Sequence, residues 1–273
     1  MEDNLSCTEK QQKTVFGTKE WAKYNENIIS GCSHDCRYCY AKTMAVRFGR
    51  KTVENWKEET IDRKKIEKRF TRRDGRFMFP TTHDITPANL DYCIMFLGNL
   101  LKSGNEVLVV SKPHLECIGT ICDRLHRYSQ QVLFRFTIGS ADDQILKFWD
   151  QNAPGFDERL EALMYAHIEG FQTSVSCEPM LDDNVEAVII RVLPYVTDAI
   201  WLGTMNQVFM RLKINGHGDK ETLSKARQLV ASQSNGFIAG LYAKHKDNRQ
   251  IKWKESIKKE VGIEIPLESG LDI

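Results

Sequence analysis

Three cysteines stand within eight positions of the segment ISGCSHDCRYCYAK, residues 29–42. They are Cys32, Cys36 and Cys39, and their spacing is C-x3-C-x2-C. Thiolates gathered this closely in one loop are typical of sites that bind a metal ion or an iron–sulfur cluster. The segment therefore predicts a metal centre, and the number of available ligands bears on its type.

Two kinds of metal centre are compatible with three close thiolates. A structural zinc site takes four ligands, usually from two pairs of cysteines or histidines, and this chain could recruit Cys7 or His34 to complete it. A [4Fe–4S] cluster held by only three thiolates leaves one iron open to a non-protein ligand. A small molecule with an amine and a carboxylate could chelate that iron.

The composition sets broad limits on function. The 273 residues are 41% hydrophobic, and 38 basic against 37 acidic residues give a net charge of +1, so no overall field favours nucleic acid or membrane. No run approaches the roughly 18 apolar residues of a membrane span, and the polar start MEDNLSCTEKQQK does not resemble a signal peptide. We therefore expect a cytoplasmic protein without membrane contact, in which grouped cysteines indicate metal binding or catalysis.

Short β-rich runs alternate with helical patterns along the chain. Several runs are almost continuously apolar, as strands buried on both faces of a parallel sheet are. Six strand-then-helix steps predict a single α/β domain with parallel strands and right-handed crossovers. The expected strands are 27–31, 76–81, 106–111, 131–138, 172–177 and 198–203, and the expected helices are 86–103, 113–127, 156–169, 183–193 and 219–234.

In such folds the ligands bind outside the carboxyl ends of the strands. Polar and cysteine residues crowd the positions that directly follow the expected strands, whereas the strands themselves are apolar. These positions are therefore the candidate functional residues. They include Cys32, Cys36, Cys39, Thr82, Asp84, Ser111, Lys112, Ser140, Cys177 and Glu178.

The cysteine spacing, with the aromatic Tyr38 before the last cysteine and after the first expected strand, resembles the signature of the radical S-adenosylmethionine (SAM) enzymes. Residues 134–181 are similar to the middle of the spore photoproduct lyase-like group and a related phage-encoded group. The shared features are a strand ending in Ile-Gly-Ser, a Glu-Arg-Leu-Glu-Ala-Leu helix and a Ser-Cys-Glu-Pro strand end. Residues 244–259 are similar to that group's C-terminus, so the resemblance spans roughly residues 27–260.

The resemblance implies a partial (β/α)6 TIM-type barrel of parallel strands. The corresponding organisation is an N-terminal extension (1–26), a core barrel (27–210) and a C-terminal helical segment packed on the barrel (211–273). We expect a monomer that receives electrons from a reducing donor such as flavodoxin or ferredoxin.

The resemblance also implies the chemistry. In the family, three cysteines bind the cluster, and the amine and carboxylate of SAM chelate the fourth iron. Reductive cleavage of SAM gives a 5′-deoxyadenosyl radical, which abstracts a substrate hydrogen atom; the cofactor carries this chemistry and the protein positions and shields it. Cys32, Cys36 and Cys39 would be the cluster ligands, and Tyr38 would lie near the adenine.

Other SAM contacts follow from the same resemblance, with one departure. The family's second strand often ends in Gly-Gly-Glu, which accepts hydrogen bonds from the SAM amine, whereas this chain has Thr-Thr-His-Asp at 81–84. Thr82 and Asp84 are the candidates for that role. Ser111 and Lys112 end the third expected strand, where a cation would meet the SAM carboxylate.

The fourth and fifth expected strands supply three more candidates. Ser140 stands where the family contacts the ribose of SAM, and Glu178 would hold ribose hydroxyls or cap the following segment. Cys177 ends a strand that should point into the barrel mouth, where a thiol could return a hydrogen atom to a product radical. The alternative is that Cys177 packs as a small hydrophobic residue.

The substrate is the least determined feature. Residues 62–76 carry eight Lys or Arg in fifteen positions, which would suit phosphates but also suits a solvated helix face. The leading hypothesis is a radical SAM enzyme that repairs or modifies a nucleic acid or nucleotide. The alternatives are radical modification of a peptide or partner protein, and a zinc-stabilised nucleic-acid-binding module without enzymatic activity.

Overall fold

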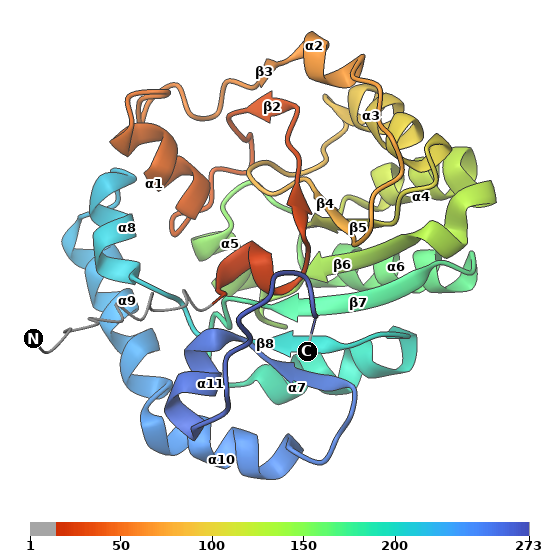
Figure 1. Ribbon diagram of the computed structural model, residues 1–273. Coiled ribbons are helices and arrows are strands. Elements are labelled where there is room, and N and C mark those ends of the chain that lie inside the picture. Colours follow the sequence, from red (N-terminus) through yellow and green to blue (C-terminus); the bar gives the residue numbers. More distant parts are fainter. Residues whose placement is uncertain (1–14, 273) are drawn as a thin grey trace, which may run out of the picture.

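The computed structural model describes residues 15–272, and its centre is one seven-stranded sheet (Figure 1). All neighbouring strands of this sheet are parallel, in the order β1-β4-β5-β6-β7-β8-β9. The predicted α/β class with parallel strands is thereby confirmed, and β1 and β9 are the two edges of a partial barrel. The strands are β1 (Tyr24–Asn25), β4 (Phe77–Phe79), β5 (Val107–Ser111), β6 (Val132–Thr137), β7 (Gln172–Cys177), β8 (Ile200–Leu202) and β9 (Ile251–Trp253).

Helices follow the strands and cover the outer face of the sheet (Figure 1). Five agree with predicted helices to within a few residues: α3 (Leu90–Lys102), α4 (Leu115–Leu125), α6 (Phe156–Ile168), α7 (Val185–Val192) and α9 (Lys220–Ser232). The others were not predicted as individual helices, although α10 and α11 fall in the segment 211–273 that was expected to be helical. They are α1 (Tyr40–Arg47), α2 (Arg63–Ile66), α5 (Asp143–Trp149), α8 (Val208–Ile214), α10 (Asn235–His245), α11 (Glu255–Val261) and the 3₁₀ turns η1 (Gly17–Glu20), η2 (His126–Gln131) and η3 (Leu193–Tyr195).

The two faces of the sheet bury different side chains, because successive residues of a strand point to opposite faces. Outward-facing residues such as Phe134 and Val175 pack with the helices in the main core. Inward-facing residues such as Leu133 and Trp201 pack with Trp21, which follows η1. The two indole rings meet edge to face at 5.8 Å. The segment before the first strand therefore helps to fill the inside of the barrel.

Buried ion pairs complete the filling of the interior. Arg135, on β6, is fully buried and lies 2.8 Å from the Asp198 carboxylate and 3.0 Å from the Asp272 carboxylate. Lys254, which follows β9, is also fully buried and lies 2.7 Å from a Glu20 oxygen. Charges removed from water in this way need partners, so these pairs tie both ends of the described chain to the barrel.

Two details of the predicted sheet are wrong. The segment 27–31 was expected to open the sheet, but its extended part, β2 (Ile29–Ser30), pairs antiparallel with β3 (Thr60–Ile61) in a separate small sheet. The edge position is taken by β1, which pairs with β4. The sheet also has a seventh strand, β9, which was not predicted. The boundaries of the three predicted segments of the chain stay predictions.

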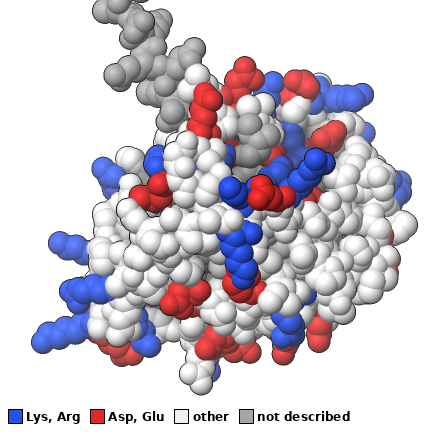
Figure 2. Space-filling view, turned by 90° about the horizontal axis from the view of Figure 1, so that it is seen from below, with Lys and Arg blue, Asp and Glu red and all other residues white. Residues whose placement is uncertain are grey.

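The surface agrees with the nearly balanced composition. Figure 2 shows positive and negative side chains interspersed among uncharged ones on the face seen from below. Within residues 15–272, no helix has the length and apolar character needed to cross a membrane.

Gly31, directly before the first cysteine, is a position that only glycine can occupy without rearrangement. Its φ is +103°, and a Cβ there would lie 2.5 Å from the Glu58 carbonyl oxygen. We expect Gly31→Ala to lower the free energy of unfolding by about 3 kcal/mol or more, from backbone strain and the backbone clash together. Gly49→Ala is the control, because Gly49 has φ +64° but open space around it. Urea unfolding of both variants measures the difference, and equal losses would contradict the close approach.

Candidate functional site

The three cysteines lie on one loop between β2 and α1, at the carboxyl-end rim of the barrel. The Cys32 N–H donates to the Trp56 carbonyl at 3.0 Å, and the Cys39 N–H donates to the Cys36 carbonyl at 3.1 Å. Cys39 caps α1, and its sulfur accepts from the Lys42 N–H at 3.4 Å. All three thiols are free, with Cys32 and Cys36 buried and Cys39 partly buried. The loop thus carries three thiols, none of which forms a disulfide bond.

Burial determines the protonation of these thiols. It raises the pKa of Cys32, Cys36 and Cys39 above the ordinary value for cysteine, and the Lys112 ammonium only partly opposes this effect at Cys36. Thiolates here need a compensating positive charge, which coordinated metal ions supply. The donor set therefore fits an iron–sulfur cluster held by three thiolates.

Asn215, in the C-terminal part of the chain, holds the end of the cysteine loop through hydrogen bonds of its side chain. Its side-chain amide donates to the Arg37 carbonyl at 2.9 Å and to the Cys39 carbonyl at 3.0 Å, and its oxygen accepts from the Thr43 hydroxyl. Asn215 is fully buried after α8, which packs beside α1 (Figure 1). Asn215 could not be predicted as a site residue, because nothing in the sequence links it to a loop about 176 positions earlier.

Asp84 connects the cysteine loop to the ends of β4 and β5. One carboxylate oxygen accepts from the Ser111 hydroxyl at 2.9 Å and from the Lys112 N–H at 2.7 Å. The other lies 2.9 Å from His34 Nδ1, 3.7 Å from Lys112 Nζ and 4.0 Å from Cys32 Sγ. Burial by itself would raise the pKa of Asp84, but the Lys112 and His34 side chains hold it well below its usual range. Asp84 is thus a buried anion with protein partners on both oxygens.

His34 extends this network to His114, which follows β5. The two Nε2 atoms lie 2.9 Å apart, so one ring donates and the other accepts. Cys32, His34 and Asp84 also bring one ligand atom each within 4.8 Å of one another. That grouping could hold a single metal ion, whereas Cys7, the other zinc ligand considered from the sequence, lies outside the described residues.

Tyr38 and Lys112 meet beside the cysteines. The Tyr38 hydroxyl donates to Asp150 at 2.6 Å, and Asp150 pairs with the fully buried Arg159 at 3.0 Å. The Lys112 ammonium lies 5.9 Å from the centre of the Tyr38 ring. Burial would lower the pKa of Lys112, but the surrounding Cys36, Tyr38 and Asp84 raise it well above the ordinary value. Lys112 is therefore a cation beside the cysteines, while the predicted adenine and carboxylate contacts stay predictions.

Two further residues that were predicted to contact SAM, Thr82 and Ser140, make hydrogen bonds within the protein. The Thr82 N–H donates to the Asn27 side chain at 2.8 Å, and Thr82 is half-buried at the rim. Ser140 is fully buried, donates its hydroxyl to Asp182 and accepts from the Asp142 N–H at 2.9 Å. The predicted roles of Thr82 with the SAM amine and of Ser140 with the ribose stay predictions.

Cys177 does not point into the barrel mouth as expected. It is fully buried in the main core with Val175, on the helix-facing side of β7. Ser174 faces inward instead, where its hydroxyl meets the Arg135 side chain. Side chains alternate along a strand, so Ser176 lies on the same inner face as Ser174. Cys177, one residue further, therefore points outward with Val175. A hydrogen donor for a substrate in the mouth would need the opposite orientation.

Glu178, one residue further, returns to the inner side of the rim. It is partly buried, and its carboxylate lies 3.5 Å from Lys254 Nζ. Burial raises the pKa of Glu178, while the Lys254 charge acts against this. Nearby, the Tyr40 hydroxyl donates to the Thr81 carbonyl at 3.2 Å. The predicted ribose contact of Glu178 stays a prediction.

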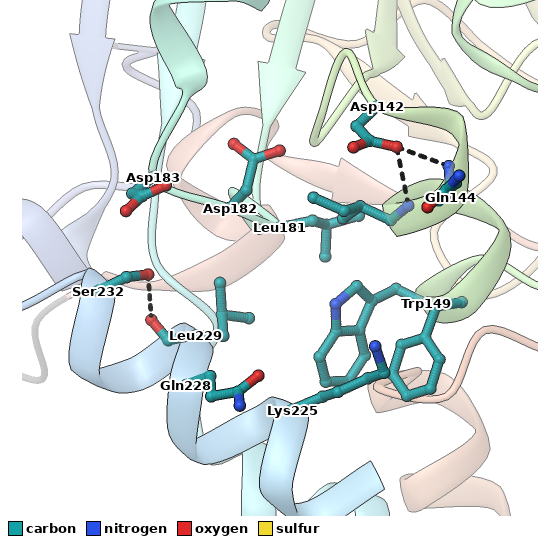
Figure 3. Close-up of a pocket in the computed structure, with 12 residues that line it drawn as sticks. Asp142, Gln144, Trp149, Leu181, Asp182, Asp183, Lys225, Gln228, Leu229 and Ser232 are labelled. Carbon is teal, nitrogen blue, oxygen red and sulfur yellow. Dashed lines mark hydrogen bonds between the residues drawn. The ribbon is translucent and has the colours of Figure 1, made fainter. Parts of the chain in front are cut away.

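A separate cavity of about 340 Å³ lies between α5, α9 and the loop after β7 (Figure 3). Figure 3 shows the carboxylates of Asp142, Asp182 and Asp183 on one side and Lys225 and Gln228 on the other. Asp142 caps α5 through the Gln144 N–H at 2.7 Å. None of the three loop cysteines lines this cavity, so it is distinct from the candidate site.

Comparison with known proteins supports the class of the fold. No family model matches the sequence. Uncharacterized protein ORF301 of Acidianus two-tailed virus is 25% identical over 170 residues, which are 58% of this chain and 56% of that protein. A double mutant of spore photoproduct lyase with bound SAM and dinucleoside spore photoproduct has a TM-score of 0.51 and 17% identity, over 81% of this chain and 64% of that one. Streptococcus suis SuiB bound to SAM gives a TM-score of 0.48 and 11% identity, over 90% of this chain and 52% of SuiB.

The fold of this chain is therefore similar to that of spore photoproduct lyase over 81% of the chain. The chain spans 56% of the viral protein and 64% of the lyase chain.

We expect Asp84→Asn to destabilise the protein by about 3 kcal/mol, because it removes a buried charge paired with Lys112 and puts an N–H group against existing donors. Thermal unfolding measures the loss, and Asp247→Asn, at an exposed position, is the control. An unchanged melting temperature in Asp84→Asn would contradict the central position of this carboxylate.

Proposed function

We propose that this protein is a radical SAM enzyme in which Cys32, Cys36 and Cys39 hold a [4Fe–4S] cluster. The observation that carries the proposal is the set of three free thiols on one loop at the rim of a barrel similar to that of spore photoproduct lyase. When bound, the reduced cluster supplies the electron that cleaves SAM to a 5′-deoxyadenosyl radical.

The chain's own residues would position the reactants. Asp84 holds the cysteine loop against β4 and β5, and Asn215 holds its other end. Lys112 offers a cation beside Cys36 for the SAM carboxylate. Because Cys32 and Cys36 are buried, water is kept from the metal ligands.

For the substrate, we propose a nucleic acid or nucleotide that is repaired or modified. The support is the lyase structure, which holds a dinucleoside spore photoproduct, and the basic stretch 62–76. Several cations of this stretch are exposed, among them Arg63, Lys64 and Arg69. Lys65 binds the Asn27 carbonyl at 3.0 Å, close to the residues that contact Thr82.

The test is anaerobic reconstitution with iron and sulfide, followed by dithionite and SAM, with 5′-deoxyadenosine measured by chromatography. We expect about four irons per chain and deoxyadenosine from the wild type. Alanine at Cys32, Cys36 or Cys39 should abolish both. Cys122→Ala is the matched control, since Cys122 is buried in α4 away from the loop.

A second candidate function rests on the grouping of Cys32, His34 and Asp84. A zinc ion held there would make the protein a zinc-stabilised nucleic-acid-binding module. The two candidate functions differ in the substitution that should remove the metal. His34→Ala would release zinc from a single-metal site but leave the cluster ligands intact. Cys36→Ala would do the reverse. A wild-type protein that is colourless and makes no deoxyadenosine, and whose bound zinc is retained in Cys36→Ala, would refute the enzyme proposal.

A further inference from the structure

The helix α8 presents one of its faces to the start of α1 and the last cysteine. Asn215, which caps α8, donates to the Cys39 carbonyl, and the Asn215 N–H donates to the Arg211 carbonyl at 2.9 Å. Residues four positions apart lie one above the other on a helix. Arg211 therefore lies on the face of α8 that looks toward Cys39 and Tyr40.

Arg211 is a partly buried cation without a strong partner. In the described part of the chain its guanidinium makes no hydrogen bond and no ion pair within 4.0 Å, although Glu178 and Tyr40 are near enough to interact with its charge. Burial lowers the pKa of Arg211, and Glu178 and Cys39 act in the opposite direction. A cation that is taken from water without a close counter-ion is costly. Such a position suits a ligand that brings its own negative charge.

We propose that Arg211 binds an oxyanion of a ligand in the barrel mouth next to Cys39. Its planar fork of N–H donors matches a carboxylate or a phosphate group through two parallel hydrogen bonds. The nearby Glu178 carboxylate and Tyr40 hydroxyl offer complementary groups to the uncharged or cationic part of the same ligand. The charge of Arg211 interacts with Cys39, whereas that of Lys112 interacts with both Cys36 and Cys39.

Two sources of this oxyanion exist, and binding measurements separate them. One is the methionine carboxylate of SAM, in which case Arg211 would take the place proposed for Lys112 and the inference rests on the proposed function. The other is a phosphate of the substrate, which does not require a cluster. Arg211 is not among the residues predicted from the sequence, because it lies within the predicted C-terminal segment and not directly after a strand.

The experiment compares Arg211→Gln and Arg211→Lys with Lys213→Gln, which removes an exposed cation from the same helix. SAM binding is measured by anaerobic equilibrium dialysis on reconstituted protein, and binding of a single-stranded oligodeoxynucleotide by fluorescence anisotropy at fixed salt. Iron content is measured in every variant, together with Asn215→Ala as an example of a residue that shapes the loop.

We expect Arg211→Gln to weaken the binding of at least one of the two ligands about tenfold or more at unchanged iron content. The affinity should recover in part in Arg211→Lys. Loss of SAM binding identifies the carboxylate, and loss of oligonucleotide binding identifies the phosphate. Affinities for both ligands within twofold of those of Lys213→Gln would overturn the inference. So would a loss of iron in Arg211→Gln equal to that in Asn215→Ala, because Arg211 would then support the loop.

A failure of the proposed function can be distinguished from a failure of the inference about Arg211. A wild type that holds no iron and binds no SAM refutes the radical SAM proposal directly. The oligonucleotide measurement still tests Arg211 in that case, since it uses the protein without a cluster.

Discussion

The Asp84 carboxylate is the interaction on which the candidate site depends. It joins the end of β4, the end of β5 and the cysteine loop through Ser111, the Lys112 backbone and His34. A buried carboxylate is stable only when charges and donors surround it, so these three segments cannot separate without exposing an unpaired anion. The loop that carries Cys32 is thereby held to the rim of the sheet.

The rest of the site is arranged around this anchor in two directions. On the Cys36 side, Lys112 and Tyr38 form a buried group linked through Asp150 to Arg159. On the Cys39 side, Asn215 reaches the loop from the end of α8, and Arg211 lies on the same helix face. The charges of Lys112 and Arg211 therefore both act on the thiols of the loop. Positive charge near buried thiols favours ligands and metal centres that carry negative charge.

Much of the fold could be predicted because its strands and helices are long enough to show a period. The apolar runs at β5 and β6 and the amphipathic pattern of α4 and α6 agree with the predicted ranges. Elements of two or three residues show such a pattern only where apolar residues surround them, as at β4 and β8, and not where the flanking residues are polar. For this reason β1, β9 and the antiparallel pairing of β2 with β3 could not be predicted, and the sheet has seven strands where six were expected.

By itself, the sequence determined the spacing of the three cysteines, the succession of strand ends and the polar residues that follow them. Their chemical types and order along the chain are local properties. Only the tertiary structure decided which way each side chain points and which distant residues meet. Cys177 faces the helices because of its position in the alternation of β7, and Asn215 contacts Cys39 because α8 packs on α1. Contacts between residues far apart in the chain depend on the packing of whole elements, which no local pattern encodes.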